Sequence, residues 1–359
     1  MREMTSRERV LAAFHRTPAD RVPVDYLANP GIDGRLKAHF GLAADDGEGL
    51  RRALGVDFRG VGPAYTGPRL HDPVPGRDVD IWGIHRRYVE HETGGYWDYC
   101  DFPLKEADEE AVARWPMPDP DDFDYESLKA QCSSHRGYAI WAGGAGLGCI
   151  INTAGFFRGM EQAFVDLITD DPAGLLLIDR FLDVQYEQTV RTLHSVGRDI
   201  DFIWMGEDLG TQLGPIISRP LFLRHILPRQ RRFFELAGAY GLPVLFHTCG
   251  SSSWAYEDYI AAGVAAMDTL QPECTDMSPA HLSGRFGSRL SFHGCISTAG
   301  ALANGTPEDV VNTVRETLDI MMPHRGFMLS PTHEIQDNSP TENVLAMYRA
   351  AREYGIYRG

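Results

Sequence analysis

Two short segments of this chain carry side chains that bind metal ions or move protons. The first is Leu245-Phe246-His247-Thr248-Cys249-Gly250, at the end of an apolar run that predicts a buried strand. Residues two apart on an extended chain point to the same side, so the imidazole of His247 and the thiol of Cys249 can converge on one ion. The spacing alone equally fits a hydrogen-bonded His247 beside a packed Cys249.

The second segment is Ser330-Pro331-Thr332-His333-Glu334-Ile335-Gln336, which follows a predicted strand near the end of the chain. In a parallel barrel the two segments would share one rim, so His333 can reach across it as a third ligand. His247, Cys249 and His333 with an open fourth position would suit Zn²⁺ acting as a Lewis acid. The alternative is that His333 donates a proton or contacts substrate without a metal.

Glu207 and Asp208 place two carboxylates after another predicted strand, in Gly206-Glu207-Asp208-Leu209-Gly210. Each can act as a metal ligand, a general base or a substrate anchor. Adjacent residues of a strand cannot both point inward, so only one is expected to touch the reacting groups directly. We expect Glu207 as a metal ligand or catalytic group and Asp208 as a catalytic group. The structural alternative is that Asp208 caps the next turn and Glu207 pairs with a basic side chain.

Five weaker candidates are expected to bind substrate because they fall near the same predicted rim or could wall a pocket beside it. Judged singly, polar residues at such positions are more often structural than functional. The five are Asn152, Phe156, Gln212, Gln271 and His293.

Eight short apolar or β-branched runs, each followed by turn residues and a helix-length segment, predict the elements that position these groups. Eight is the number that closes a parallel barrel, so we expect an α/β fold, a (β/α)8 TIM barrel with an N-terminal helix. The runs are Val22 to Leu27, Val56 to Val61, Tyr138 to Ala142, Phe202 to Met205, Pro243 to His247, Val264 to Leu270, Leu290 to His293 and Phe327 to Ser330.

Capping patterns predict several helix starts. Thr5-x-x-Glu8 opens the N-terminal helix, Thr306-Pro307 opens a later one, and Ser339-Pro340 precedes the last. Pro228 interrupts a helical pattern between residues 218 and 236, so we expect a kink or break near Leu227.

Residues 62–136 are rich in Pro, Gly, Asp and aromatic side chains and are too long for an ordinary loop. We expect one domain over residues 1–359, with residues 62–136 as a lid-like excursion between the second and third strands that folds over the barrel mouth. A small hairpin is expected within it, between Trp82 and Tyr99.

Composition limits the partners and the compartment. The net charge of −16 argues against nucleic acid and anionic membranes as partners, because both attract clustered Lys and Arg. No long apolar run and no signal-peptide pattern is present, so we expect a cytoplasmic protein. The six cysteines are scattered, and we expect them reduced. The glycine-rich turn at 143–148 lacks the Lys-Ser/Thr of a phosphate-binding loop.

The chain resembles the uroporphyrinogen decarboxylase superfamily over nearly its whole length, and more closely the methyltransferase branch than the true decarboxylases. The motifs that carry this resemblance are Arg7-Glu8-Arg9-Val10 with Asp20-Arg21-Val22-Pro23-Val24, Asp80-Ile81-Trp82-Gly83, Gly206-Glu207-Asp208-Leu209-Gly210, His247-x-Cys249-Gly250 and Pro340-Thr341-Glu342-Asn343-Val344.

The resemblance implies a zinc site built from the His-x-Cys pair and a later ligand, and methyl transfer to or from a corrinoid. The later ligand is often Cys in the coenzyme M methyltransferases of this branch, whereas His333 stands at the matching position here. True decarboxylases carry an Arg-Gln-x-x-Gly-Arg-Tyr segment near the first strand for their many substrate carboxylates. This chain has Val24-Asp25-Tyr26-Leu27-Ala28-Asn29-Pro30-Gly31 there.

We therefore predict a zinc-dependent methyltransferase that moves a methyl group between a small O-, N- or S-methyl compound and a corrinoid protein. The chain lacks the Asp-x-His-x-x-Gly signature, so a separate protein is expected to carry the corrinoid. Two alternatives stay open: a metal-free lyase of the uroporphyrinogen decarboxylase type, and a non-catalytic barrel that binds a ligand or a corrinoid protein. The oligomeric state is open, with a homodimer among the options.

Overall fold

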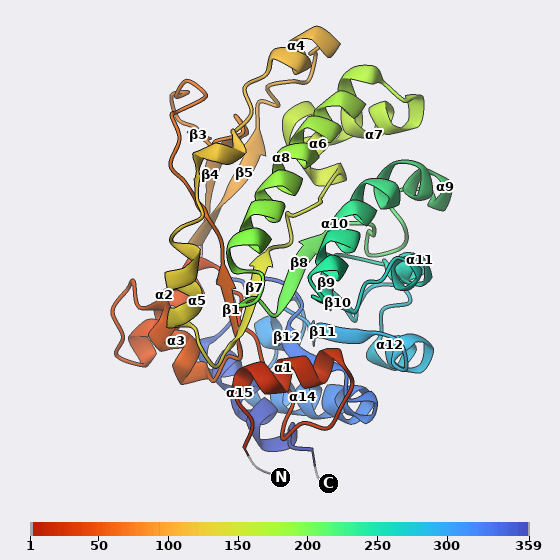
Figure 1. Ribbon diagram of the computed structural model, residues 1–359. Coiled ribbons are helices and arrows are strands. Elements are labelled where there is room, and N and C mark those ends of the chain that lie inside the picture. Colours follow the sequence, from red (N-terminus) through yellow and green to blue (C-terminus); the bar gives the residue numbers. More distant parts are fainter. Residues whose placement is uncertain (1–2, 93, 358–359) are drawn as a thin grey trace.

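The main sheet of the protein is a curled parallel sheet whose strand order follows a barrel. The computed structural model describes residues 3–92 and 94–357, and within them this sheet has seven strands in the order β1-β7-β8-β9-β10-β11-β12 (Figure 1). The strands are β1 Phe58–Val61, β7 Ala139–Gly143, β8 Phe202–Gly206, β9 Val244–Thr248, β10 Ala266–Thr269, β11 Ser291–Ile296 and β12 Phe327–Pro331.

Residues 22–27 take the eighth place, between β12 and β1. Val24 bridges Leu329 of β12 in parallel, and its carbonyl accepts the N–H of Asp57, directly before β1. The prediction of a regular strand here was wrong: the segment makes single bridges only, and Pro23 has no N–H to extend a ladder. The predicted TIM-barrel architecture is nevertheless confirmed, because this segment joins the two edge strands.

Helices surround the sheet, and α1 and α15 lie at the end of the molecule opposite β3–β5 and α4 (Figure 1). Capping boxes begin α1 at Thr5 and α14 at Thr306, as predicted. The helices are α1 Ser6–Phe14, α2 Pro30–His39, α3 Gly47–Leu54, α4 Glu109–Arg114, α5 Leu128–Ser134, α6 Ile151–Arg158, α7 Met160–Thr169, α8 Pro172–Val196, α9 Arg219–Leu221, α10 Leu227–Ala239, α11 Tyr256–Ala261, α12 Pro279–Phe286, α13 Ala301–Asn304, α14 Pro307–Met321 and α15 Thr341–Tyr354.

The helical pattern around Pro228 is interrupted as predicted. A single π-helical stretch, Phe222–Ile226, separates α9 from α10, and α10 begins at Leu227 with the proline in its first turn. Proline fits that position because the first N–H groups of a helix have no partner within it.

Residues 62–136 form a separate set of small elements between β1 and β7. They contain the predicted hairpin, β4 His85–His91 paired with β5 Gly94–Cys100, and β3 Asp78–Val79 beside β4. β2 Ala64–Tyr65 pairs with β6 Phe123–Asp124. At Gly94 an added Cβ would lie 2.2 Å from the carboxylate of Asp337, which follows β12, so the hairpin reaches the loops at the C-terminal ends of the strands.

The strands are buried on both faces, as expected for a parallel sheet covered by helices. Every residue of β8, β9, β10, β11 and β12 is buried.

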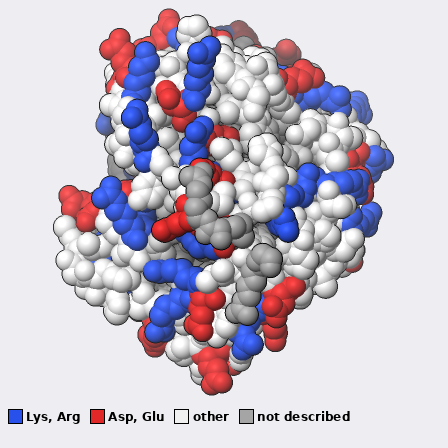
Figure 2. Space-filling view, turned by 60° about the horizontal axis from the view of Figure 1, so that its bottom comes forward, with Lys and Arg blue, Asp and Glu red and all other residues white. Residues whose placement is uncertain are grey.

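Acidic and basic side chains lie interspersed on the face around α1 in Figure 2. No helix in the described ranges is long and apolar enough to cross a membrane, and the six cysteines are free.

Asp57 is a fully buried carboxylate that joins the N-terminal helix to the closing segment. One oxygen accepts from Arg9 of α1 at 2.6 Å, and Arg21 donates to both oxygens at 2.8 and 3.0 Å. The N–H of Val24 adds a bond of 2.8 Å. The carboxylate therefore pairs with two arginines, of which Arg9 also pairs with Asp20, and it holds the segment that closes the barrel.

We expect Asp57→Ala to lower the free energy of unfolding by about 3–5 kcal/mol, because it removes the carboxylate partner of Arg21, one of the two carboxylates paired with buried Arg9, and the acceptor of the Val24 N–H. Urea denaturation followed by circular dichroism measures this. Glu257→Ala is the matched control: it breaks an exposed pair with Arg289 and should cost less than about 1 kcal/mol. Equal losses in the two variants would contradict the assigned role of Asp57.

Candidate active site

His247 and Cys249 lie together at the C-terminal end of β9. His247 is buried and Cys249 is half-buried, and Nε2 of the imidazole is 3.4 Å from Sγ. The chain turns immediately afterwards at Gly250, whose φ is +72°. A Cβ at Gly250 would lie 2.2 Å from the carbonyl oxygen of Gly210, so only glycine allows these two loops to approach so closely.

His333 joins this pair from the segment after β12. Its ring centroid lies 5.9 Å from that of His247, and one ligand atom from each of His247, Cys249 and His333 lies within 4.8 Å of the others. His333 is exposed, whereas its two partners are more buried. The structure therefore brings together the three side chains that the sequence predicted to meet.

Asp268 of β10 supports His247 from behind. Its two oxygens lie 2.8 Å from Nδ1 of His247 and 2.6 Å from Nδ1 of His293, whose Nε2 lies 3.2 Å from Asp25. Burial favours the neutral acid, yet the charge of His293 and the hydrogen bonds from both imidazoles hold the pKa of Asp268 below its usual range. One carboxylate thus orients two imidazoles.

Both imidazoles are affected by this contact. Burial by itself lowers the pKa of a histidine, but the carboxylates of Asp268 and Asp25 raise that of His293 to about 9. Hydrogen bonds with Asp268 and Cys249 likewise raise the pKa of His247 well above its usual value, against the effect of burial. With Nδ1 facing Asp268, His247 presents Nε2 to Cys249.

Asp208, rather than Glu207, faces the His-Cys pair. One Asp208 oxygen accepts the N–H of Cys249 at 3.0 Å and lies 3.7 Å from Nε2 of His247. The other oxygen accepts from the side-chain amide of Asn152 at 2.7 Å. Although burial opposes ionisation, the charge of His247 and these hydrogen bonds lower the pKa of Asp208.

Glu207 points instead at the start of α6. Its buried carboxylate accepts the N–H groups of Ile150 at 2.7 Å and Ile151 at 3.2 Å, and Sγ of Cys149 lies 3.6 Å away. Burial, followed by the neighbouring charge of Asp208, raises the pKa of Glu207 to about 8. Glu207 is outside the metal-capable group that the described residues form, so its predicted place in the metal sphere does not correspond to this geometry.

The five predicted substrate contacts fall into different places. Gln271 accepts the N–H of Gly250 at 2.7 Å and so fixes the turn after the pair. Asn152 holds Asp208, and His293 lies under Asp268. Gln212 is exposed and uses its backbone carbonyl to hold Ser251. Phe156 stacks on Tyr99 and lines a different cavity, described below.

A small cavity of about 70 Å³ lies inside the barrel beside this group. His247, Asp268, His293 and His333 line one part of it, and aromatic rings line another. The indole N–H of Trp204 is buried there without a hydrogen-bond partner among the described residues. The remaining lining includes Phe58, Trp141, Tyr26, Asp25 and Arg51.

The site lies in a part of the chain that matches a known protein family. A family model described as uroporphyrinogen decarboxylase (URO-D) matches residues 159–354, more than half of the chain. This chain belongs to the uroporphyrinogen decarboxylase family. The matched region contains His247, Cys249 and His333.

A solved structure supports the fold of this family member. A methyltransferase from Methanosarcina mazei superposes with a TM-score of 0.65 at 18% identity, covering 98% of this chain and 99% of that one. At that identity the likeness concerns the fold. No curated protein sequence matches the chain significantly.

Sequence reasoning missed four residues at the site of this uroporphyrinogen decarboxylase family member: Asp25, Arg51, Trp204 and Asp268. Asp268 did carry a signal, because a carboxylate within the apolar run 264–270 needs a buried partner. Asp25 lies in a predicted strand and carries the same signal. Arg51 carried none, because it reaches the cavity from α3, outside the strands and the loops that follow them.

The raised pKa of Glu207 predicts a pH-dependent stability. Because the pKa is about 8 in the folded protein and about 4.3 in the unfolded chain, the folded state alone keeps this proton between those values. The contribution to stability is full at acidic pH and is lost as the pH rises toward 8. Its steepest loss is roughly 1.4 kcal/mol per pH unit.

We expect Glu207→Gln, which cannot ionise, to gain stability relative to the wild type as the pH rises from about 5 to about 8. Urea denaturation of metal-free protein across this range measures the difference. Glu235→Gln, at an exposed position of α10, is the control. Parallel curves of stability against pH for wild type and Glu207→Gln would show that burial does not raise the pKa of this carboxyl.

Proposed function

We propose that this protein is a zinc-dependent methyltransferase that moves a methyl group between a small methylated compound and a corrinoid carried by a separate protein. One observation carries the proposal: an imidazole, a thiol and a second imidazole have ligand atoms within 4.8 Å of one another at the C-terminal ends of the strands. Active sites of parallel barrels are built at this rim.

The donor set fits zinc. Two imidazoles and a thiolate leave a fourth position open, as in catalytic zinc sites. The 3.4 Å between Nε2 of His247 and Sγ of Cys249 is close to the edge of a zinc tetrahedron, about 3.5 Å for Zn–ligand bonds of 2.0–2.3 Å. A zinc ion held there would supply a Lewis acid for the substrate heteroatom.

The chain's own residues would orient these ligands. Asp268 holds Nδ1 of His247, which leaves Nε2 available to a cation, and such carboxylate partners normally accompany zinc-bound histidines. Asp208 holds the backbone of Cys249, and Asn152 holds Asp208. The arrangement reduces the conformational freedom of both ligands before any cation binds.

The neighbouring cavity would hold the methylated compound. The unpartnered indole N–H of Trp204 is available to an acceptor atom of a ligand, and the aromatic lining would exclude water. In the proposed reaction the bond between the methyl carbon and its heteroatom breaks, the heteroatom keeps the electron pair, and the methyl passes to the corrinoid. Stabilising that electron pair is the main requirement.

Cavity size and charge favour this reaction over porphyrinogen decarboxylation. About 70 Å³ suits a small molecule rather than a tetrapyrrole, and Arg51 is the one arginine among the described residues that line it. A substrate with many carboxylates needs several arginines to offset its charge. The name of the structurally similar protein, a methyltransferase, supports the same choice.

We expect purified protein to bind one equivalent of zinc and Cys249→Ser to weaken zinc binding by more than about 100-fold. Competition with a chromophoric chelator measures the affinity. Methylation of free cob(I)alamin, followed by visible absorbance with a panel of O-, N- and S-methyl donors, should fail in parallel. Cys132→Ser, a buried cysteine remote from the group, is the control. Unchanged zinc binding in Cys249→Ser would refute the proposed metal site.

We expect Asp268→Asn to reduce zinc affinity by about 10- to 100-fold, because the amide can no longer hold both imidazoles as a carboxylate does. The same chelator competition measures this loss. Asp276→Asn, on an exposed turn where asparagine is tolerated, should leave the affinity unchanged. Equal zinc affinities for the two variants would show that Asp268 does not orient His247 for zinc binding.

A further inference from the structure

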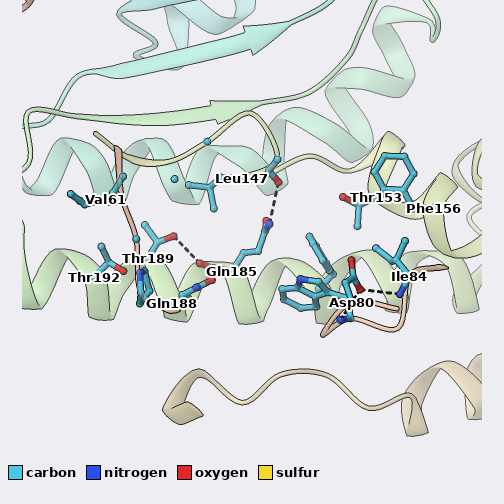
Figure 3. Close-up of a pocket in the computed structure, with 18 of the residues that line it drawn as sticks. Val61, Asp80, Ile84, Leu147, Thr153, Phe156, Gln185, Gln188, Thr189 and Thr192 are labelled. Carbon is cyan, nitrogen blue, oxygen red and sulfur yellow. Dashed lines mark hydrogen bonds between the residues drawn. The ribbon is translucent and has the colours of Figure 1, made fainter. Parts of the chain in front are cut away.

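A second and larger cavity lies away from the metal-capable group. It has a volume of about 440 Å³, within the usual range for small-molecule sites, and it shares no lining residue with the cavity described above. Figure 3 shows α8 along one side, with Gln188, Thr189 and Thr192 facing the space, and Thr153 and Phe156 of α6 at one end. Residues from the 62–136 excursion, including Asp80 and Ile84, complete it.

The two cavities lie on opposite sides of the barrel wall. Gly60 pairs with Trp141 across β1 and β7, and both line the inner cavity. The next pair, Val61 and Ala142, lines the outer cavity. Because successive residues of a strand point to opposite faces, the outer cavity lies between the strands and α8.

The outer cavity offers unused hydrogen-bonding groups. Thr153 and Thr192 are buried, and their hydroxyls bond to no other group in the described ranges; the same holds for the amide of Gln188. Gln185, by contrast, is used internally: it accepts the N–H of Gly148 and donates to the carbonyl of Gly146. These groups face the cavity, where a ligand or water can meet them.

Ring-bearing side chains line the rest of the space. Phe156 is stacked on Tyr99 with 3.5 Å between ring centroids, and Trp82 contacts Phe181 at 4.3 Å. All four line the cavity. Such walls favour a flat ring, which can stack or meet them edge-on.

The lining carries no free charge. None of the described residues that form it is Lys, Arg or His. Its one carboxylate, Asp80, already accepts the N–H groups of Trp82 and Ile84 and pairs with Arg86. An ionic ligand would lose its hydration without gaining a counter-charge, so a neutral ligand is favoured.

We propose that this outer cavity is a binding site for a neutral, flat, ring-bearing molecule with an amide-like group, in which the ring meets Trp82 and Phe156 and the polar group meets Thr153 at the same end of the cavity. Gln188 and Thr192 lie further along α8 and would meet a longer substituent. The site is distinct from the metal-capable group and does not depend on methyl transfer. Its wall nevertheless includes the 143–147 turn, and the carbonyl of Leu147 accepts the N–H of Gly206, next to Glu207.

Three near-isosteric probes test the proposal by isothermal titration calorimetry on the full chain: benzamide, benzoate and benzamidine. We expect benzamide to bind once per chain and at least about tenfold more tightly than either ion, because burying an uncompensated charge is costly. Benzoate or benzamidine binding as tightly as benzamide would overturn the assignment, and so would the absence of saturable benzamide binding.

Variants locate the binding. The variant Thr153→Val keeps side-chain volume and should weaken benzamide binding at least about fivefold, because the hydroxyl beside the ring can no longer bond to the amide. Thr313→Val, at a half-buried position of α14 outside the cavity lining, is the matched control, and circular dichroism verifies folding. His333→Ala should leave benzamide affinity unchanged. Equal affinity in the wild type and Thr153→Val, or a loss in His333→Ala, would overturn the outer cavity as the site.

Discussion

The site depends on one constraint: the strands run parallel in a closed ring, so all of them end at the same rim. Closure is made by an irregular segment rather than by a strand, and the buried carboxylate of Asp57 holds that segment against two arginines and the N–H of Val24. With the ring closed, the segments after β9 and β12 face each other, although many residues separate them in sequence.

Within that rim, paired charges explain how so many ionisable groups stay buried. His247, Asp268, His293 and Asp25 alternate in sign and are linked by hydrogen bonds. Each buried charge therefore has an opposite neighbour, and the desolvation penalty is offset locally. The same chain fixes which nitrogen of His247 faces Cys249. The same carboxylates therefore balance the buried charges and orient the imidazoles.

Glu207 shows the opposite solution to burial. Burial, with no basic partner among the described residues, and the neighbouring charge of Asp208 raise its pKa, although two backbone N–H groups at the start of α6 favour the ionised form. Two adjacent carboxylates thus experience different environments: Asp208 lies beside the opposite charge of His247, whereas Glu207 is fully buried and faces the like charge of Asp208. Neighbouring residues of β1 and β7 also face different environments, because side chains alternate along a strand. One cross-strand pair lines the inner cavity and the next pair lines the outer cavity.

Local patterns in the sequence were enough to predict the regular elements and the His247-Cys249 pair. Apolar runs located seven regular strands, caps located α1 and α14, and two-residue spacing put His247 and Cys249 on one side of the chain, because these features depend on neighbours in sequence. Tertiary structure alone decided that Asp208 rather than Glu207 faces the pair, that Asp268 holds His247, and that Phe156 lines the outer cavity. Those outcomes depend on the rotation of each strand end and on side chains from distant segments, which local periodicity does not encode.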